Sequence, residues 1–367
     1  MNRWLWWGAV LTTLLPLIAG CWDQRPVEGR ALVEAVGVAP TGRRGVWQWT
    51  FVLPNPTESV STLGTLPPSE EVYAVTLSAP TWTAALLAAQ QQTTRDLYFG
   101  QFRVLALSPR LPASAWARII ATVNRSGRLL KTFWIVDADP AGLVVRTPTR
   151  TEGAPLYGLF KLLSCHCQPY TWGQRAWQVW SRLMTPGVTP LVPVIRAVPQ
   201  RGIQNPRMAV LGSRQVIQWS AAASAGWAYL TQHVVKGGLT VQAAGHRVGL
   251  NRVRGASHVT FTRAGSRIDV TDRLTYRGEL EDAPLSLPLT LATKTAIAAQ
   301  ASRAIDQLGE QAIRSAQQQK VDPFGWHRDL EWARNQPGSP WPAPISWAGW
   351  SVHLIVHFRI TGEGVSH

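Results

Sequence analysis

Segments with the residue pattern of β-strands alternate with helix-like segments through the first third of the chain, and this alternation constrains the fold most strongly. The strand-like segments are short and rich in branched and aromatic residues, whereas the helix-like segments place apolar residues three or four positions apart. We expect strands at residues 32–38, 46–53, 71–77, 102–107 and 131–137, and helices at residues 81–92 and 112–124. Helices in this order cover apolar sheets, so we predict an α+β protein with mixed β-sheets flanked by helices.

The remainder of the chain has further elements and one proline-rich interruption. We expect helices at 156–163, 173–183 and 221–232, and strands at 207–211, 215–218, 239–243, 247–253, 257–263, 267–276 and 350–360. Residues 188–206 contain four prolines and a glycine, which indicates a boundary. A chain of 367 residues is too long for one ordinary domain. We therefore expect an N-terminal region at 21–200, composed of two subdomains, and a C-terminal domain at 205–367.

The clearest helix is predicted at residues 290–320. Its apolar positions recur at spacings of three, four or seven: Leu291, Ala298, Ala301, Ile305, Leu308, Ala312 and Ala316. At 1.5 Å per residue such a helix spans about 45 Å. We interpret the stripe as core packing, and the strand at 350–360 follows this helix as the last element.

Residues 1–20 have the pattern of a bacterial export signal. The uncharged, largely apolar segment at 4–18 has about 15 residues, fewer than the roughly 20 that a permanent membrane helix needs. Residues 18–21, Ile-Ala-Gly-Cys, match the lipobox of bacterial lipoproteins. We therefore predict signal cleavage after Gly20 and lipidation of Cys21. An ordinary signal peptide with a chance cysteine and an uncleaved membrane helix are the alternatives.

Lipidation at Cys21 would attach a diacylglycerol group and, in some pathways, a further N-acyl chain. Two acyl chains are enough to hold a protein on a membrane durably. The polar segment at 22–31 can extend to at most about 35 Å, so the folded part would lie close to the lipid. The chain is therefore expected on the outer face of the cell membrane.

The positive charge of the chain is unevenly distributed. The formal net charge is +15, and no acidic residue occurs at 153–268. No catalytic carboxylate can therefore come from this stretch. A surface of that sign attracts anionic lipid, so the basic region 153–268 is a second candidate membrane contact. The alternative is compositional, with arginines scattered over all faces, and we expect no nucleic acid partner.

Three short motifs resemble catalytic or metal sites, and each is incomplete. His353 and His357 fall in an alternating, strand-like segment, where residues four apart are about 13 Å apart and cannot bind one ion. Ser224 lies in half of a nucleophile elbow that lacks the first glycine. Cys165 and Cys167 could form a strained bridge or bind a soft metal, or be a peculiarity of this chain. We predict a protein that is not an enzyme, with no catalytic or metal-binding residues and no cofactor besides the lipid.

Tryptophans are concentrated near the carboxyl terminus, where Trp341, Trp347 and Trp350 lie among prolines. Each ring is either a core wedge or an anchor of a binding surface. The density of the cluster keeps the second interpretation open.

Four segments resemble the Ger(x)C family, the C-subunit lipoproteins of spore germinant receptors. Residues 21–28, Cys-Trp-Asp-Gln-Arg-Pro-Val-Glu, are similar to the start of the mature family proteins, and residues 95–105 resemble a Leu-Tyr-Phe-Gly-His passage. Residues 208–211 resemble the start of the second half, and residues 318–325 with Trp347 and Gly362 resemble the last helix and strand. The chain departs from the pattern at Gln101, where the family has His, and at Leu211, where it has Phe.

The resemblance implies a three-domain fold and a non-enzymatic subunit that is lipid-anchored to the outer face of the inner spore membrane. It also implies two kinds of partner, a permease-like membrane subunit and a large membrane subunit, which together sense small nutrient germinants and trigger germination. The alternative is a lipid-anchored solute-binding protein that feeds a membrane transporter, and a surface hydrolase with an unrecognised site is a third hypothesis.

Overall fold

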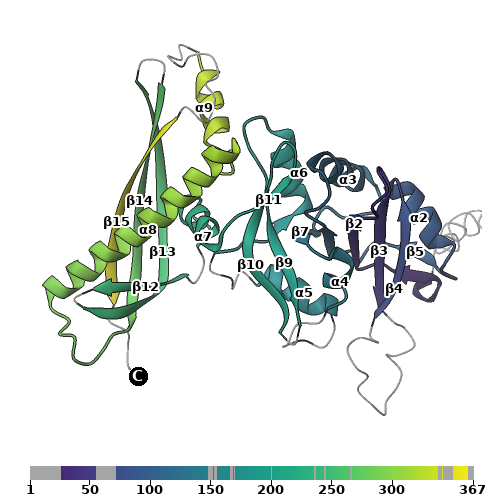
Figure 1. The fold of residues 1–367 in the computed structure, drawn as a ribbon, viewed down its shortest axis with the longest axis horizontal. Coiled ribbons are helices and arrows are strands. Elements are labelled where there is room, and N and C mark those ends of the chain that lie inside the picture. The colour runs from purple at the N-terminus through teal and green to yellow at the C-terminus, as the bar shows by residue number, and fades with distance from the viewer. Residues whose placement is uncertain are drawn as a thin grey trace, which may run out of the picture.

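A computed structural model of the chain shows an elongated molecule with one large sheet at its centre and amino-terminal end and a second sheet at the other end (Figure 1). The residues that the structure describes are 26–54, 72–147, 152, 155–165, 168, 170–199, 201–234, 237–243, 245–264, 267–337, 341 and 350–362. None of the helices in these ranges combines the length and the apolarity that a bilayer crossing requires. The predicted α+β class, with mixed sheets flanked by helices, is confirmed.

The larger sheet has nine strands, in the order β11-β10-β9-β7-β6-β2-β3-β4 with β8 paired to β7. The strands are β2 (Ala35–Pro40), β3 (Trp47–Pro54), β4 (Val72–Ala79), β6 (Val104–Leu107), β7 (Trp134–Ala138), β8 (Gln174–Arg175), β9 (Leu191–Val198), β10 (Gly202–Leu211) and β11 (Val216–Gln218). The four central strands β2, β6, β7 and β9 are parallel, and antiparallel strands flank them on both sides.

Helices cover both faces of this sheet. The helices of the first face are α2 (Trp82–Gln90), α3 (Ala113–Arg125) and α6 (Ala176–Met184), and those of the second are α4 (Ala141–Val144) and α5 (Pro155–Ser164). Because both faces are covered, successive strand residues enter two different cores. Leu105 and Leu107 pack with the first set of helices, and Val104 and Ala106 pack with the second.

The proline-rich segment 188–206, where we expected a boundary, forms β9 and the start of β10. Its prolines avoid the positions where a strand needs its N–H groups. Pairing of β9 with β7 begins at Val194, just after Pro193, and Pro206 lies in the bulge between Gln204 and Arg207. Strand β11 therefore still belongs to the larger sheet, and the division of the chain near residue 200 stays a prediction.

The second sheet has four strands in the order β12-β13-β14-β15. These strands are β12 (Gly237–Ala243), β13 (His246–Ala264), β14 (Arg267–Asp282) and β15 (Ser351–Gly362). Helices α7 (Ala221–Leu230) and α8 (Leu291–Gln319) pack on one face, and α8 confirms the predicted long helix. Of its predicted stripe, four residues are buried and two are half-buried, but Leu291 at the first turn is 82% exposed and does not pack in the core. A short helix that we did not predict, α9 (Trp326–Arg334), follows α8.

One strand of this sheet corrects the sequence interpretation. We expected separate strands at 247–253 and 257–263, but β13 runs through both. A register shift near Arg252, which has a φ of 51°, absorbs the irregularity. Gly255 is required within the strand because a Cβ there would lie 2.3 Å from the Thr275 carbonyl oxygen and 2.5 Å from the Tyr276 ring. The glycine thus makes room for the main chain and a ring of the neighbouring strand and does not mark a turn.

Candidate functional site

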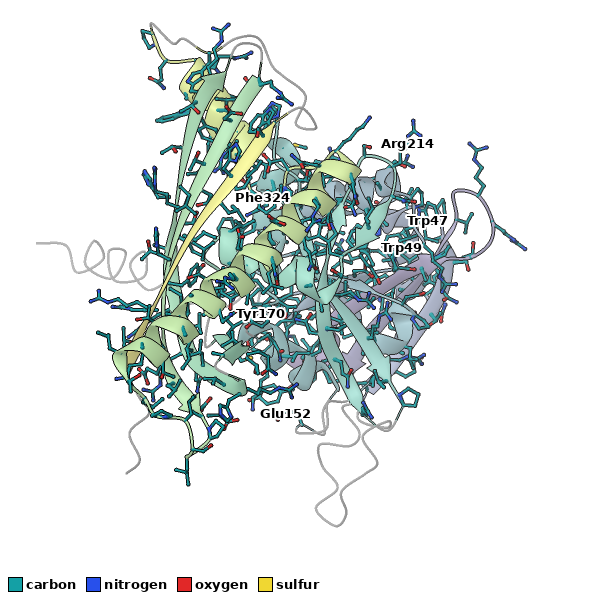
Figure 2. All side chains as sticks on the ribbon, turned by 60° about the vertical axis from the view of Figure 1, so that its left-hand side comes forward. Trp47, Trp49, Glu152, Tyr170, Arg214 and Phe324 are labelled. Atoms are coloured by element: carbon teal, nitrogen blue, oxygen red, sulfur yellow. The ribbon has the colours of Figure 1, made fainter. Side chains whose placement is uncertain are left out.

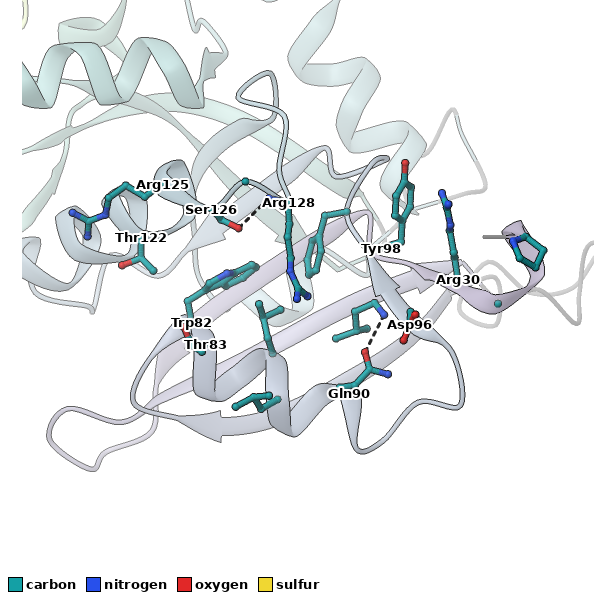
Figure 3. Close-up of a pocket in the computed structure, with 17 residues that line it drawn as sticks. Arg30, Trp82, Thr83, Gln90, Asp96, Tyr98, Thr122, Arg125, Ser126 and Arg128 are labelled. Atoms are coloured by element: carbon teal, nitrogen blue, oxygen red, sulfur yellow. Dashed lines mark hydrogen bonds between the residues drawn. The ribbon is translucent and has the colours of Figure 1, made fainter. Parts of the chain in front are cut away.

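A surface groove lies at the amino-terminal end of the described chain, with a volume of about 1160 Å³. Its walls come from four short stretches that are distant in sequence (Figure 3). These are the start of β1 (Arg30–Leu32), one side of α2, the strand β5 (Asp96–Tyr98) and the carboxyl end of α3. Strands β1 and β5 form a small parallel pair of their own, which closes one side of the groove.

The floor of the groove is aromatic and apolar. Trp82, at the first turn of α2, is 4% exposed, and its ring centroid lies 5.6 Å from that of Phe99. Helix α2 begins here because the Thr81 side chain accepts a hydrogen bond from the Ala84 N–H at 3.2 Å. The Trp82 indole Nε1 is buried without a hydrogen-bond partner among the described residues. The floor therefore offers apolar surface and one unused donor.

The rim is polar and mainly basic. Arg30 lies over the Tyr98 ring, with its guanidinium carbon 4.5 Å from the ring centroid. Arg125 is the last residue of α3 and Arg128 lies in the turn after it, and Figure 3 shows Arg128 extending toward α2. Asp96 is the one carboxylate among the lining residues. Three arginines against one aspartate favour an anionic group at this rim.

The end of α2 is fixed to the strand that forms the opposite wall. The Gln90 side chain accepts a hydrogen bond from the Leu97 N–H at 3.0 Å and donates one to the Arg95 carbonyl at 2.9 Å. These bonds hold β5 against α2 without any charged pair. An apolar floor beside a basic rim is an arrangement suited to binding.

A buried carboxyl marks the carboxyl end of β7 in the larger sheet. Asp137 is fully buried, and its Oδ2 accepts a hydrogen bond from Gln218 Nε2 at 3.0 Å, while its Oδ1 has no partner in the described part of the chain. Gln218 in turn accepts a bond from Arg196 at 2.8 Å. Burial raises the pKa of Asp137 to about 7, although Gln218 and Arg196 oppose that rise.

A second buried aspartate connects the two large sheets. The Asp322 carboxylate accepts hydrogen bonds from the N–H groups of Phe324, Gly325 and His327 at 2.6–3.0 Å and so begins α9. Its main chain exchanges two hydrogen bonds with Thr189, just before β9. The resemblance at residues 318–325 therefore falls on a structural corner, and burial raises the pKa of Asp322 to about 6 despite the three donors.

Two of the predicted site residues, Gly20 and Cys21, lie outside the described residues, as does Cys167. Cys165 directly follows α5 and is disulfide-bonded. Ser224 lies inside α7, where its hydroxyl donates to the Ser220 carbonyl at 2.8 Å and accepts from the Met208 N–H at 3.0 Å. Both bonds are structural, which agrees with a chance match to the elbow motif.

The histidine pair and the tryptophan cluster are also located. His353 and His357 project from the same exposed side of β15, so the strand interpretation is confirmed. Trp350 is 4% exposed in the second core and stacks on His327, with ring centroids 5.8 Å apart. Trp341 packs against the same core, and Trp347 lies outside the described residues. For Trp350 the core interpretation is confirmed.

Several basic residues of the acid-free stretch at 153–268 interact with other residues of the chain through hydrogen bonds, ring contacts or ion pairs. Arg182 donates to the Pro323 carbonyl at 3.2 Å, Arg175 lies over the Trp134 ring at 4.3 Å, and Arg252 pairs with Glu279 at 3.0 Å. The stretch is thus not one continuous basic surface. Sequence reasoning did not find the groove, although the segment at 96–99 that lines it belongs to one of the four resembling stretches.

Comparison with known proteins gives consistent results for the two parts of the chain. A family model described as the spore germination protein N-terminal domain matches residues 23–197, and one described as spore germination B3/GerAC like, C-terminal, matches residues 207–363. A solved structure described as the crystal structure of the GerBC protein is similar, with a TM-score of 0.55 and 12% identity, over 90% of this chain and 99% of that chain. At this identity the likeness shows the fold. No curated protein sequence matches the chain.

Proposed function

This chain belongs to the GerAC family of spore germination proteins, and from that premise we propose that it is the lipid-anchored, non-enzymatic C subunit of a spore germinant receptor. The observation that carries the proposal is that both halves of the chain match the family, in the family's order. In this role the protein works beside a permease-like membrane subunit and a large membrane subunit. Together they sense small nutrient germinants and trigger germination.

The lipobox at residues 18–21 supports the anchored location on the outer face of the inner spore membrane. Only five peptide steps separate Cys21 from Pro26, and five residues span at most about 18 Å. Pro26 lines the groove, so the groove is the part of the described chain that an anchor at Cys21 would hold nearest to lipid.

Replacement of the anchoring residue tests the proposed location. Cys21→Ala removes the thiol that would carry the diacylglycerol group, so the protein should leave the membrane fraction of sporulating cells. Cys165→Ala, which breaks the disulfide of Cys165 but leaves the lipobox sequence intact, should leave the protein in that fraction. Continued membrane association of the Cys21→Ala protein through a high-salt wash would contradict the anchor.

Deletion of the coding sequence tests the receptor role. We expect spores that no longer respond to at least one nutrient germinant, measured as loss of optical density after nutrient addition, while vegetative growth is unchanged. Reintroduction of the wild-type chain should restore the response. Unchanged germination in a strain from which every other nutrient receptor has also been removed would contradict the proposal.

The groove favours one second candidate, a lipid-anchored solute-binding protein that feeds a transporter. Its volume of about 1160 Å³ could hold an amino acid or a sugar against the aromatic floor. That function predicts that one such solute raises the melting temperature of the purified chain by several degrees, and that Arg128→Ala abolishes the increase. The absence of any stabilisation across amino acids and sugars would remove this alternative.

A further inference from the structure

The four-stranded sheet has one face that no described helix covers. Its inner side chains pack on α7 and α8, and its outer side chains alternate with them along each strand. Figure 2 shows side chains projecting freely from this outer face. We call it the arginine face and define it by four exposed residues on three adjacent strands, Arg254, Arg273, Arg277 and Arg359.

Strand register places three of these arginines in a single row. Arg254 of β13 is paired with Arg277 of β14, and Arg277 is paired with Arg359 of β15. Paired residues of adjacent strands lie on the same face at a strand spacing of about 4.8 Å, so three guanidinium groups project side by side. In the next row, Thr275 pairs with His357 and Ala256, which keeps the surface flat and polar.

The row has no internal counter-charge. No described carboxylate lies within ion-pair distance of Arg254, Arg277 or Arg359. The nearest glutamate along β14, Glu279, already pairs with Arg252 at 3.0 Å. Like charges directly opposite each other in a sheet are destabilising. A fold that keeps three of them together would gain stability from an anionic partner that bridges the row.

We propose that the arginine face is a docking surface for an acidic segment of a partner protein, which places carboxylates across Arg254, Arg277 and Arg359. Arginine is suited to this role because its planar guanidinium accepts a carboxylate in a bidentate arrangement. The proposal adds a surface for a partner to the proposed receptor subunit. Its preference for a protein over lipid as the ligand rests on the proposed lipid anchor at Cys21.

The position of the face favours a protein over a membrane. The face lies on the side of the sheet opposite α7, the helix whose Ser224 hydroxyl accepts from Met208 of β10 in the larger sheet. Strand β5, which pairs with β1 just after the anchoring region, lies at the opposite end of the molecule (Figure 1). Lipid held at one end is therefore remote from the arginine face. The strands of the face carry no outward phenylalanine, tyrosine or tryptophan among the described residues, which disfavours stacked single-stranded nucleic acid.

A binding assay with matched charge variants tests the proposal. The protein is the full chain with Cys21→Ala, which keeps every residue of the face and removes lipidation. The test variant adds Arg254→Gln, Arg277→Gln and Arg359→Gln. The control adds Arg43→Gln, Arg44→Gln and Arg118→Gln, three exposed arginines of the larger sheet's half that give the same change of charge. The probe is fluorescein-labelled poly-L-glutamate, measured by fluorescence anisotropy.

We expect the parent and the control to bind the peptide with similar affinity, and the test variant to bind it about tenfold more weakly or worse. Equal affinity of test variant and control would overturn the proposal, because binding would then reflect net charge alone. Two further arms use vesicles of phosphatidylglycerol and phosphatidylcholine, and oligodeoxythymidylate. If the test variant bound the vesicles or the oligonucleotide more weakly than the control did, but bound the peptide equally well, the proposal would be overturned in favour of lipid or nucleic acid. Failure of the anchor would show only in membrane fractionation and would leave the peptide arm unchanged.

Discussion

The two large sheets of this protein differ in how many of their faces are covered. The nine-stranded sheet has helices on both faces, and all four residues of β6 are buried. The four-stranded sheet has α7 and α8 on one face only, so buried and exposed residues alternate along β14. The covered sheet must therefore place functional groups at its ends, as in the groove and at Asp137. The open sheet can display them across a whole face.

We expect the two halves to differ in how much an added methyl group at a tightly packed glycine destabilises them, and this is the largest effect that we predict. In Gly226→Ala the new Cβ would lie 1.9 Å from the Leu308 carbonyl oxygen, so α7 and α8 must separate. In Gly37→Ala it would lie 2.9 Å from the main chain of Ala141, which requires a smaller shift. We expect destabilisation by about 3 kcal/mol or more for Gly226→Ala and about 2 kcal/mol for Gly37→Ala.

Urea unfolding followed by tryptophan fluorescence measures both variants. Gly127→Ala is the matched control, because nothing lies within 4 Å of its new Cβ, and its unfolding midpoint should be unchanged or slightly raised. A Gly226→Ala midpoint equal to that of Gly127→Ala would show that the helix contact over the four-stranded sheet is loose.

Each sheet also contains one buried aspartate with an unpartnered oxygen, and their titration sharpens the comparison. Burial raises the pKa of Asp137 to about 7 and that of Asp272 to about 6, from an ordinary value of 3.8. A raised folded-state pKa contributes stability below pH 3.8, and that stability is lost as the pH rises through the folded value. The free energy of unfolding should therefore fall between about pH 4 and pH 7.

Substitution by asparagine removes this loss. At pH 8 we expect Asp137→Asn to stabilise the protein by about 2 kcal/mol and Asp272→Asn by about 1 kcal/mol, and at pH 4 we expect little effect from either. Urea midpoints at the two pH values measure the difference, with the exposed Asp282→Asn as control. If Asp137→Asn destabilised the protein equally at both pH values, the carboxylate would be serving as an essential acceptor for Gln218.

The sequence predicted those elements whose evidence is local. The stripe of α8 and the alternation of β15 depend on neighbours three, four or two positions apart, and both are confirmed except at Leu291, the exposed first position of the stripe. Helix α9 was missed because its start depends on Asp322 and on Gly325 in a left-handed conformation, not on a serine or threonine cap. The groove was missed because Arg30, Trp82 and Arg128 meet only through the tertiary fold.

The arginine row was missed for a related reason. The pairing of Arg254 with Arg277 depends on the register shift near Arg252, which displaces the partner positions between β13 and β14. A count of basic residues in the acid-free stretch includes Arg254 but excludes Arg277 and Arg359, which lie after Asp269. Because the charge was counted by sequence segment, Arg254 was counted apart from Arg277 and Arg359, with which strand pairing aligns it.

Relief of repulsion within the open face is the smallest effect we expect, and it bears directly on the contrast between the sheets. Arg277 lies between Arg254 and Arg359, so Arg277→Gln removes both like-charge repulsions of the row with one substitution. We expect stabilisation by about 0.5 kcal/mol at low ionic strength and almost none in 1 M salt, where the screening length is about 3 Å. Thermal unfolding at the two salt concentrations measures the change, with the exposed Arg118→Gln on helix α3 as control. Destabilisation by Arg277→Gln at low salt would contradict the repulsive row. It would indicate that the open sheet binds its own counter-charge, and the face would then be as self-contained as the covered faces of the larger sheet.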